Sequence, residues 1–283
     1  MIPSKLNPMG INLTENLPLT LTAEQANSTV KLTATGSPTV SGLHYRLGKS
    51  GLWIPYTIGY TITLAHIGDC VQFGNSADTL SSSGQDYVQF VMTGSLAGSG
   101  NIQSMLNWSA SCPDFCFFNL FVLCSSLTSA PELPSLQLGN YCYRQMFRES
   151  SITAMPELPA TVLVQGCYDT MFFRCYSLAG TVMLPAMLFI NGCYSSMLRQ
   201  TAITEINIAA SSGLATNSML NMLYGCASLS KIEVNFTSWG SIATATQNWV
   251  DGVAAEGTFI KPAALPEEYG VNRIPTGWTV VNK

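Results

Sequence analysis

The stretch Cys142-Tyr-Arg-Gln-Met-Phe, together with the phrase Ile152-Thr-Ala-Met-Pro-Glu-Leu158 that follows it, is one copy of a motif that this chain repeats. The successive copies open at Cys116, Cys142, Cys167, Cys193 and Ser218, so their spacing is almost constant. A fixed period in the twenties is typical of solenoids, in which each repeat forms one coil of the chain.

Each copy has two halves with different hydrophobic patterns. The first half carries apolar residues at i, i+4 and i+5, which predicts one face of a short helix. The second half has the form L-x-x-Φ-x-Φ, where Φ is mostly apolar, and this alternation predicts a half-buried strand. Pro131 and Pro156 limit that strand in the first two copies, because proline has no N–H to donate. Together the halves predict a leucine-rich-repeat solenoid.

Equivalent apolar positions are expected to form ladders, because stacked copies bury an apolar face that a single copy cannot bury. The predicted ladders are Leu127, Ile152, Leu178, Ile203 and Leu229 in the strand half, and Leu120, Met146, Met171, Met197 and Met222 in the other half. A further aromatic ladder is predicted to pack between coils rather than to bind a ligand. It consists of Phe117, Tyr143, Tyr168 and Tyr194.

Most of the nine cysteines recur at two equivalent repeat positions. Because buried cysteine behaves as a small apolar residue, these cysteines are predicted to be reduced core side chains. Cys112 and Cys116 are the best candidates for a metal site. No second pair matches them, however, and structural zinc requires four converging ligands. The sequence therefore predicts no metal and no cofactor.

The segments around the repeats predict the domain organisation. Residues 1–18 are rich in Pro and Asn and are expected to form an arm. Residues 19–100 hold short alternating runs separated by turn residues, which predicts a small β-sandwich. The solenoid of about five repeats is expected over residues 101–240, and a C-terminal capping hairpin over residues 241–283. The predicted fold class is β-rich α+β.

Charged residues make up only 10% of the chain, compared with about 25% in an ordinary soluble protein. A polar surface with so few charges suits a protein in a large assembly or outside a cell. The net charge of −4 provides no basic footprint for nucleic acid. The chain has no apolar run as long as the roughly 18 residues that would predict membrane insertion. Residues 1–8 lack the charged start and apolar stretch of a signal peptide.

The pattern C-Y-x-x-M-F-x-x-C-x-S-L-T-x-x-P-E-L-P resembles the BspA-like leucine-rich repeats of gut bacterial surface proteins and of the phages that infect those bacteria. The resemblance covers about residues 106–240, and the flanking segments 41–46, 249–254 and 274–278 are also similar to segments that accompany such repeats. The second Cys of the motif is missing in the copies that open at Cys142 and Cys193. The resemblance implies adhesion or recognition without catalysis, and it implies no particular ligand.

No sequence motif indicates catalysis. The G-x-S-x-G, H-E-x-x-H, P-loop and G-x-G-x-x-G patterns are absent. His44 and His66 have no nucleophile motif beside them, and a lone histidine lacks the partners that a catalytic base needs. The chain is therefore predicted not to be an enzyme. The alternative is a carbohydrate-active enzyme, but the spacing of Asp and Glu predicts no carboxylate pair.

Aligned copies place arginine and aromatic residues in rows on the first half of the repeat. The six residues predicted to bind a ligand are Arg148, Phe173, Arg199 and Tyr224 in one row, and Phe118 and Arg144 in another. Such rows can hold a sugar or an aromatic group by stacking and cation–π contact. Neighbouring copies are expected about 5 Å apart on the strand side and about twice that on the helical side. The alternative is a set of ordinary solvated residues, with Phe173 packed against a neighbour.

The strand half offers a second candidate surface, a mildly acidic strip. It comprises Glu132, Glu157, Met183, Asn207 and Glu233. Calcium requires six or more converging oxygens, so solvated carboxylates are the favoured interpretation of this strip.

The repeat resemblance, the low charge and the missing signal peptide together predict a phage virion protein. Its expected role is that of a fibre component that binds a glycan or protein of the bacterial surface. Other virion proteins and further copies of the chain, as in a trimer, are the remaining expected partners. The alternative is a secreted bacterial cell-surface adhesin, which would bind in the same way at a different location.

Overall fold

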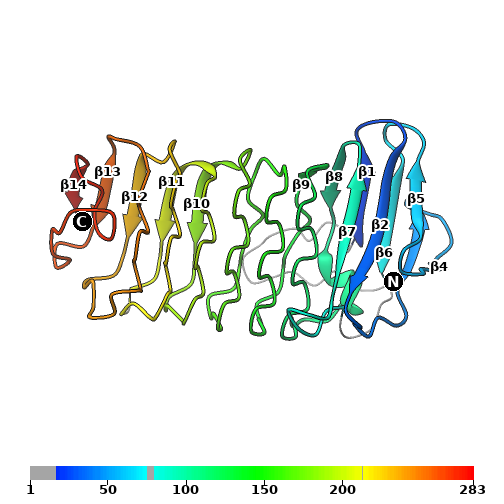
Figure 1. Cartoon of the computed structure of the whole chain (residues 1–283), viewed down its shortest axis with the longest axis horizontal. Helices are drawn as coiled ribbons and strands as arrows, with labels where there is room; N and C mark the ends of the chain where they lie inside the picture. Colours follow the sequence, from blue (N-terminus) through cyan, green and yellow to red (C-terminus); the bar gives the residue numbers. More distant parts are fainter. Residues whose placement is uncertain (1–16, 75–79, 212) are drawn as a thin grey trace, which may run out of the picture.

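The computed structural model describes residues 17–74, 80–211 and 213–283. It is β-rich, with an N-terminal β domain at one end of a solenoid and strand β14 (Thr279–Asn282) at the other (Figure 1). The only helix among the described residues is the 3₁₀ helix η1 (Ile102–Leu106). The predicted α+β class is therefore wrong in its helical part. Of the predicted arm, only residues 17 and 18 lie within the described part of the chain.

The N-terminal β domain contains two sheets. One has the strand order β5-β2-β7, and the other has the order β4-β3-β6-β1-β8-β9. The strand bounds are β1 Leu19–Ala23, β2 Ser28–Thr35, β3 His44–Leu47, β4 Ile54–Pro55, β5 Thr61–Leu64, β6 Cys70–Gly74, β7 Tyr87–Thr93, β8 Leu96–Ser99 and β9 Leu127–Ser129. The rings of Phe73 on β6 and Phe90 on β7 bring the two sheets together, with centroids 5.2 Å apart.

The larger of these sheets continues into the solenoid. Strand β8 pairs antiparallel with β1 and parallel with β9, which belongs to the first repeat. The Phe90 N–H donates to the Leu120 carbonyl at 2.7 Å, and the Phe90 ring stacks on Phe121 at 5.0 Å. An open solenoid end exposes apolar surface. Here the β domain covers that end, so one continuous sheet crosses the boundary predicted at residue 100.

The second halves of the later repeats form a parallel sheet, with the strands side by side in Figure 1. Its strands are β10 Ala179–Leu184, β11 Ala202–Ile208, β12 Lys231–Val234, β13 Thr258–Lys261 and β14. The second repeat forms no strand, and Thr153 bridges the gap by single backbone hydrogen bonds to Thr128 and Ala179. This agrees with the expectation that proline would limit the strand in that repeat.

The C-terminal capping hairpin predicted for residues 241–283 is wrong. Strands β13 and β14 pair in parallel, with Phe259 opposite Val280. Residues 241–252 also continue the repeat, because the Met219 N–H donates to the Ala245 carbonyl at 2.8 Å. Lys261 is buried and its ammonium donates to the Leu265 carbonyl and to Asn282 Oδ1. The segment therefore adds coils to the solenoid instead of folding back on it.

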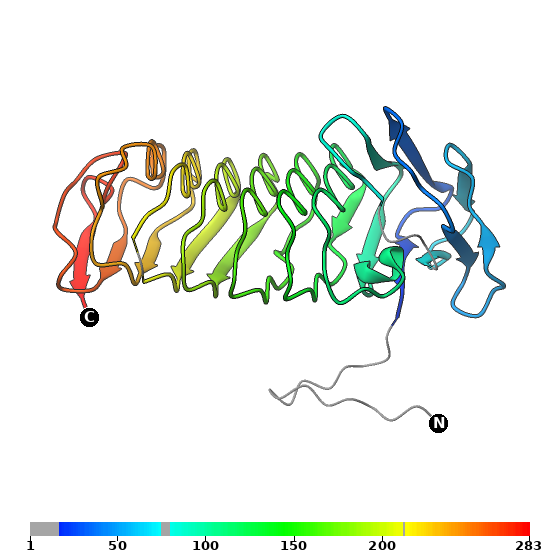
Figure 2. The ribbon, with the colours of Figure 1, turned by 90° about the horizontal axis from the view of Figure 1, so that it is seen from below.

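The half of each repeat that was predicted to be helical is a ribbon of β-turns, visible as a row of tight curls along one side of the solenoid in Figure 2. Every second N–H donates to the carbonyl three residues back, as from Arg144 to Tyr141 at 3.1 Å. The intervening N–H groups donate to the next coil, as from Tyr143 to Cys167 at 3.1 Å. Every fourth residue is left-handed, including Gln145 with a φ of 58°. The helix prediction is wrong because neighbouring coils accept the hydrogen bonds that a helix would make internally.

The predicted ladders are confirmed. Every member of the leucine/isoleucine ladder and of the leucine/methionine ladder has an exposed fraction of 0%. The predicted aromatic ladder stacks coil upon coil, with ring centroids 5.7 Å apart for Phe117–Tyr143, 5.9 Å for Tyr143–Tyr168 and 6.1 Å for Tyr168–Tyr194. A second stack, which was not predicted, joins Phe121, Phe147 and Phe172 at 5.5 and 5.6 Å. The doubled spacing expected on this side is wrong, because directly hydrogen-bonded ribbons lie almost as close as strands.

Candidate ligand-binding face

The ribbons present pairs of outward residues between pairs of buried ones. In the second repeat, Cys142 and Tyr143 point inward, Arg144 and Gln145 outward, and Met146 inward again. The next outward pair is 148–149. We define the ribbon face as the outward residues of the ribbons in repeats two to five. Because the coils are in register, equivalent outward residues form rows along this face.

The first predicted row forms a continuous stack of cations and rings. The Arg199 guanidinium carbon lies 4.5 Å from the Tyr224 ring centroid and 5.3 Å from that of Phe173. Arg148 lies 5.4 Å from the same Phe173 centroid. The repeats of Arg148 and Arg199 flank that of Phe173, so the ring lies between two guanidinium groups. All four residues are half-buried, and each contact is within the range of cation–π attraction.

The second predicted row is only partly available to a ligand. Arg144 lies 6.0 Å from the Phe118 centroid and forms an ion pair with Asp169 at 2.9 Å. Burial raises the pKa of Asp169, while Thr170 and Arg144 oppose that shift. Phe118 is buried, and its ring packs edge-on against Tyr87 of β7 at 5.3 Å. The prediction that Phe118 contacts a ligand is therefore wrong, because the β domain covers it.

Two residues of the ribbon face were not predicted. Arg174 lies 4.8 Å from the Phe173 centroid, closer than either flanking arginine. Glu149 forms ion pairs with Arg148 at 3.1 Å and with Arg174 at 3.7 Å. A helix would turn these positions away from the row. In the ribbon the residue after each row member also points outward, so reading the alignment one position further would have found both.

The strand face of the solenoid, formed by the outward residues of β10 to β14, differs from the ribbon face in its charges. Lys231 pairs with Glu205 at 3.1 Å, and Lys283 pairs with Glu233 at 2.6 Å. The acidic-strip residues Met183, Asn207 and Glu233 lie opposite one another in the sheet register. The carboxylate of Glu233 is thus already occupied by a lysine.

The cysteines are part of the core. All nine are buried and free. Burial raises the pKa of Cys167 and Cys193 to about 12. Hydrogen bonds, first from Cys116 and then from Cys142, lower the pKa of Cys112, whose side chain is only 3% exposed. Within the described ranges, no group of three or more His, Cys, Asp or Glu side chains is arranged to hold a metal ion.

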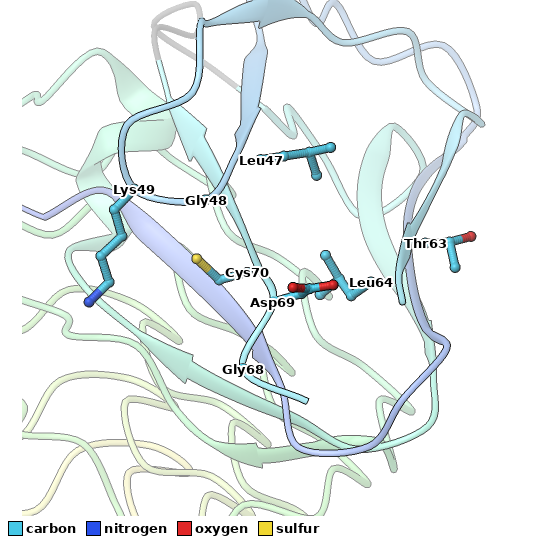
Figure 3. A pocket seen from close by; sticks show the side chains of 8 residues that line it. All are labelled: Leu47, Gly48, Lys49, Thr63, Leu64, Gly68, Asp69 and Cys70. Atoms are coloured by element: carbon cyan, nitrogen blue, oxygen red, sulfur yellow. The ribbon is translucent and has the colours of Figure 1, made fainter. Parts of the chain in front are cut away.

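A shallow cavity of about 490 Å³ lies on the β domain, between the turns that follow β3 and β5 (Figure 3). Asp69 is its only carboxylate, and that group accepts the His66 N–H at 2.9 Å and lies 3.3 Å from the His66 ring. Lys49 and Thr63 lie on either side of Asp69 in Figure 3. The lining thus brings no second carboxylate to Asp69, whose own contacts with His66 stabilise a turn.

Comparisons of the chain with protein-family models, with curated proteins and with solved structures find no match. In the part of the chain that the structure describes, no helix has the length and apolar character needed to cross a membrane. The functional conclusion therefore depends on the geometry of the ribbon face.

Proposed function

We propose that this chain is a non-enzymatic binding protein of the BspA-like leucine-rich-repeat type, a phage fibre component that attaches to a bacterial surface through its ribbon face. The observation that carries the proposal is the stack of Arg148, Phe173, Arg199 and Tyr224. Its side chains are held in place by one another before any ligand arrives. Binding to such a surface loses little side-chain entropy, which favours affinity.

The arrangement of the two domains supports a fibre. The β domain covers only the first coil, through Phe90 and Phe121, and leaves the ribbons of the later repeats open. In the proposed role the β domain contacts other virion proteins or further copies of the chain, and the solenoid extends away from them. A secreted bacterial adhesin would use the same ribbon face, so location separates the two roles. Immunogold labelling of phage particles and of host cells distinguishes them.

The test of binding uses the pure, fluorescently labelled full chain and a panel of gut bacteria. The variant Arg148→Ala, Phe173→Ala, Arg199→Ala is expected to lose at least about tenfold in affinity, since hot-spot losses of this size are common at arginine and aromatic residues. The matched control, Glu205→Ala, Asn207→Ala, Lys231→Ala, changes the strand face and should bind like the unmodified chain. If both variants bound the cells equally well, the ribbon face would be rejected as the binding surface. Release of reducing sugar from the cells would instead indicate an enzyme.

A further inference from the structure

The ribbon face concentrates positive charge in a protein that has little of it. The chain has six arginines and a net charge of −4. Four of those arginines, at positions 144, 148, 174 and 199, lie on the ribbon face. Asp169 neutralises Arg144, and Glu149 is shared by Arg148 and Arg174. In the described ranges no ion pair involves Arg199, so three arginines around Phe173 share one carboxylate.

The stacking of guanidinium groups on the Phe173 ring also determines which atoms of each arginine a ligand can contact. Guanidinium groups from both flanking coils lie close to the Phe173 ring, so a sugar cannot use the ring as an open stacking platform. A guanidinium group over a ring keeps its N–H donors in its own plane, along its edges. Arg199 Nε has no acceptor among the described residues, so ring contacts rather than hydrogen bonds hold this side chain. Arg199 is half-buried, and among the described residues its terminal N–H groups have no hydrogen bond or ion pair, so they can still donate to a ligand.

We propose, building on the function proposed above, that the ribbon face binds a polymer of anionic sugars. Its acidic groups accept hydrogen bonds from Arg199 and from those N–H groups of Arg148 and Arg174 that do not already donate to Glu149 or Gln200. Arginine binds carboxylate and phosphate groups in a two-pronged geometry. Arg148 and Arg199 are two coils apart, which corresponds to roughly 10 Å. A polymer with acidic groups at intervals along its chain can thus contact both arginines at once, which strengthens binding by avidity.

The test measures binding of the full chain to three immobilised polymers. They are polygalacturonate, which carries carboxylates, polyribitol phosphate, which carries phosphodiesters, and dextran, which is neutral. We expect binding to one or both anionic polymers, and we expect it to weaken at least about tenfold between 50 mM and 500 mM salt because exposed charges are screened. Which anionic polymer binds more tightly identifies the acidic group. Preference for dextran, binding to none of the three, or insensitivity to salt would overturn the proposal.

Matched variants connect that binding to the ribbon face. Arg199→Gln should weaken binding to the anionic polymer about tenfold, since it removes one charge-assisted contact. Lys231→Gln removes the same charge from the strand face and should leave the affinity within about twofold, because that lysine is already paired. Far-ultraviolet circular dichroism checks that both variants are folded. If both variants lost the same affinity for the anionic polymer, the loss would come from the change in net charge alone, and the proposal would be rejected.

The experiments distinguish a failure of the anionic-ligand proposal from a failure of the proposed role in attachment to bacteria. Cell binding that depends on Phe173 and Arg199 but is unaffected by salt and by anionic polymers would retain the binding role and reject the anionic ligand. Absence of cell binding together with tight, Arg199-dependent polymer binding would retain the anionic site and reject attachment to the tested bacteria.

Discussion

The two sides of the solenoid are built on almost the same coil spacing but carry side chains in different ways. On the strand face, successive side chains alternate between core and solvent, and opposite charges pair from coil to coil, as in Glu205–Lys231. On the ribbon face, side chains leave in adjacent pairs, and Arg199 stacks between Phe173 and Tyr224 instead of pairing with an acid. The comparison shows two ways of holding a cation: the alternating strand face pairs its lysines with glutamates of other coils, whereas the paired outward positions of the ribbon face hold an arginine against rings without an acid.

Alkaline pH should produce the largest difference between the two sides. The ribbon side holds the buried thiols and phenols, and burial raises the pKa of Cys167 from its ordinary 9.0 to about 12 and that of Tyr168 well above 10.0. Above pH 9 the unfolded chain releases protons that the folded chain retains. The stability is therefore fully present below pH 9 and is lost as the pH rises toward 12, by about 1.4 kcal/mol per pH unit for each such group.

Urea denaturation at pH 7, 9, 10 and 11 measures this loss. Cys193→Ala removes one thiol whose pKa is also raised to about 12, so its pH slope should be shallower by that same increment per unit. A free energy of unfolding that does not change between pH 9 and 11 would contradict the burial of these groups on the ribbon side.

Two glycines at equivalent positions of the ribbon should differ in how they tolerate alanine. Gly166 and Gly192 have left-handed φ values of 57° and 62°. A Cβ on Gly192 has only the Gly166 Cα nearby, at 4.0 Å, whereas a Cβ on Gly166 would lie 2.3 Å from the Tyr141 ring. Gly192→Ala should cost about 1–2 kcal/mol for the left-handed backbone alone. Gly166→Ala should cost more, because the Tyr141 ring must leave its 5.0 Å stack with Phe115.

Thermal and urea unfolding of the two single variants, side by side, test this difference. Equal costs would mean that Tyr141 moves aside without loss, so that the ribbon rings are not held by their neighbours.

The smallest effect is expected at the second cysteine position of the repeat. The Cys175 thiol donates to the Phe147 carbonyl of the preceding coil at 2.9 Å. In the repeats that open at Cys142 and Cys193, Ser150 and Thr201 occupy this position, and the Thr201 hydroxyl donates to the Leu198 carbonyl at 2.8 Å. Cys175→Ala removes one hydrogen bond and should cost about 1 kcal/mol. Cys175→Ser keeps a donor in place and should cost less, as measured by urea denaturation; the reverse order would show that apolar packing dominates at this position.

Ladder membership was predictable from the sequence because it depends only on spacing. Leu178 and Ile203 lie one repeat apart, and any stacked coil of that length brings them together. The helix prediction failed because apolar residues at i, i+4 and i+5 fit a helix and a turn ribbon equally well. The additional buried residue at i+1, Tyr143 or Tyr168, was the available signal, since it makes inward pairs separated by outward pairs.

The candidate site was predictable only as a list of row members. Arg148, Phe173, Arg199 and Tyr224 do form one row. Phe118 was assigned wrongly, because its neighbour Tyr87 is distant in sequence and covers it only in the folded chain.

The sequence by itself determined the period of the solenoid, the members of its ladders and the limit that proline places on the second strand, because identical coils in register require nothing beyond equal spacing. Only the tertiary structure decided where every second ribbon N–H donates, since its acceptor is a carbonyl about one full repeat away on the next coil. That choice brings the coils on the ribbon side close enough for guanidinium groups to stack on rings. It thereby creates the surface from which we infer binding.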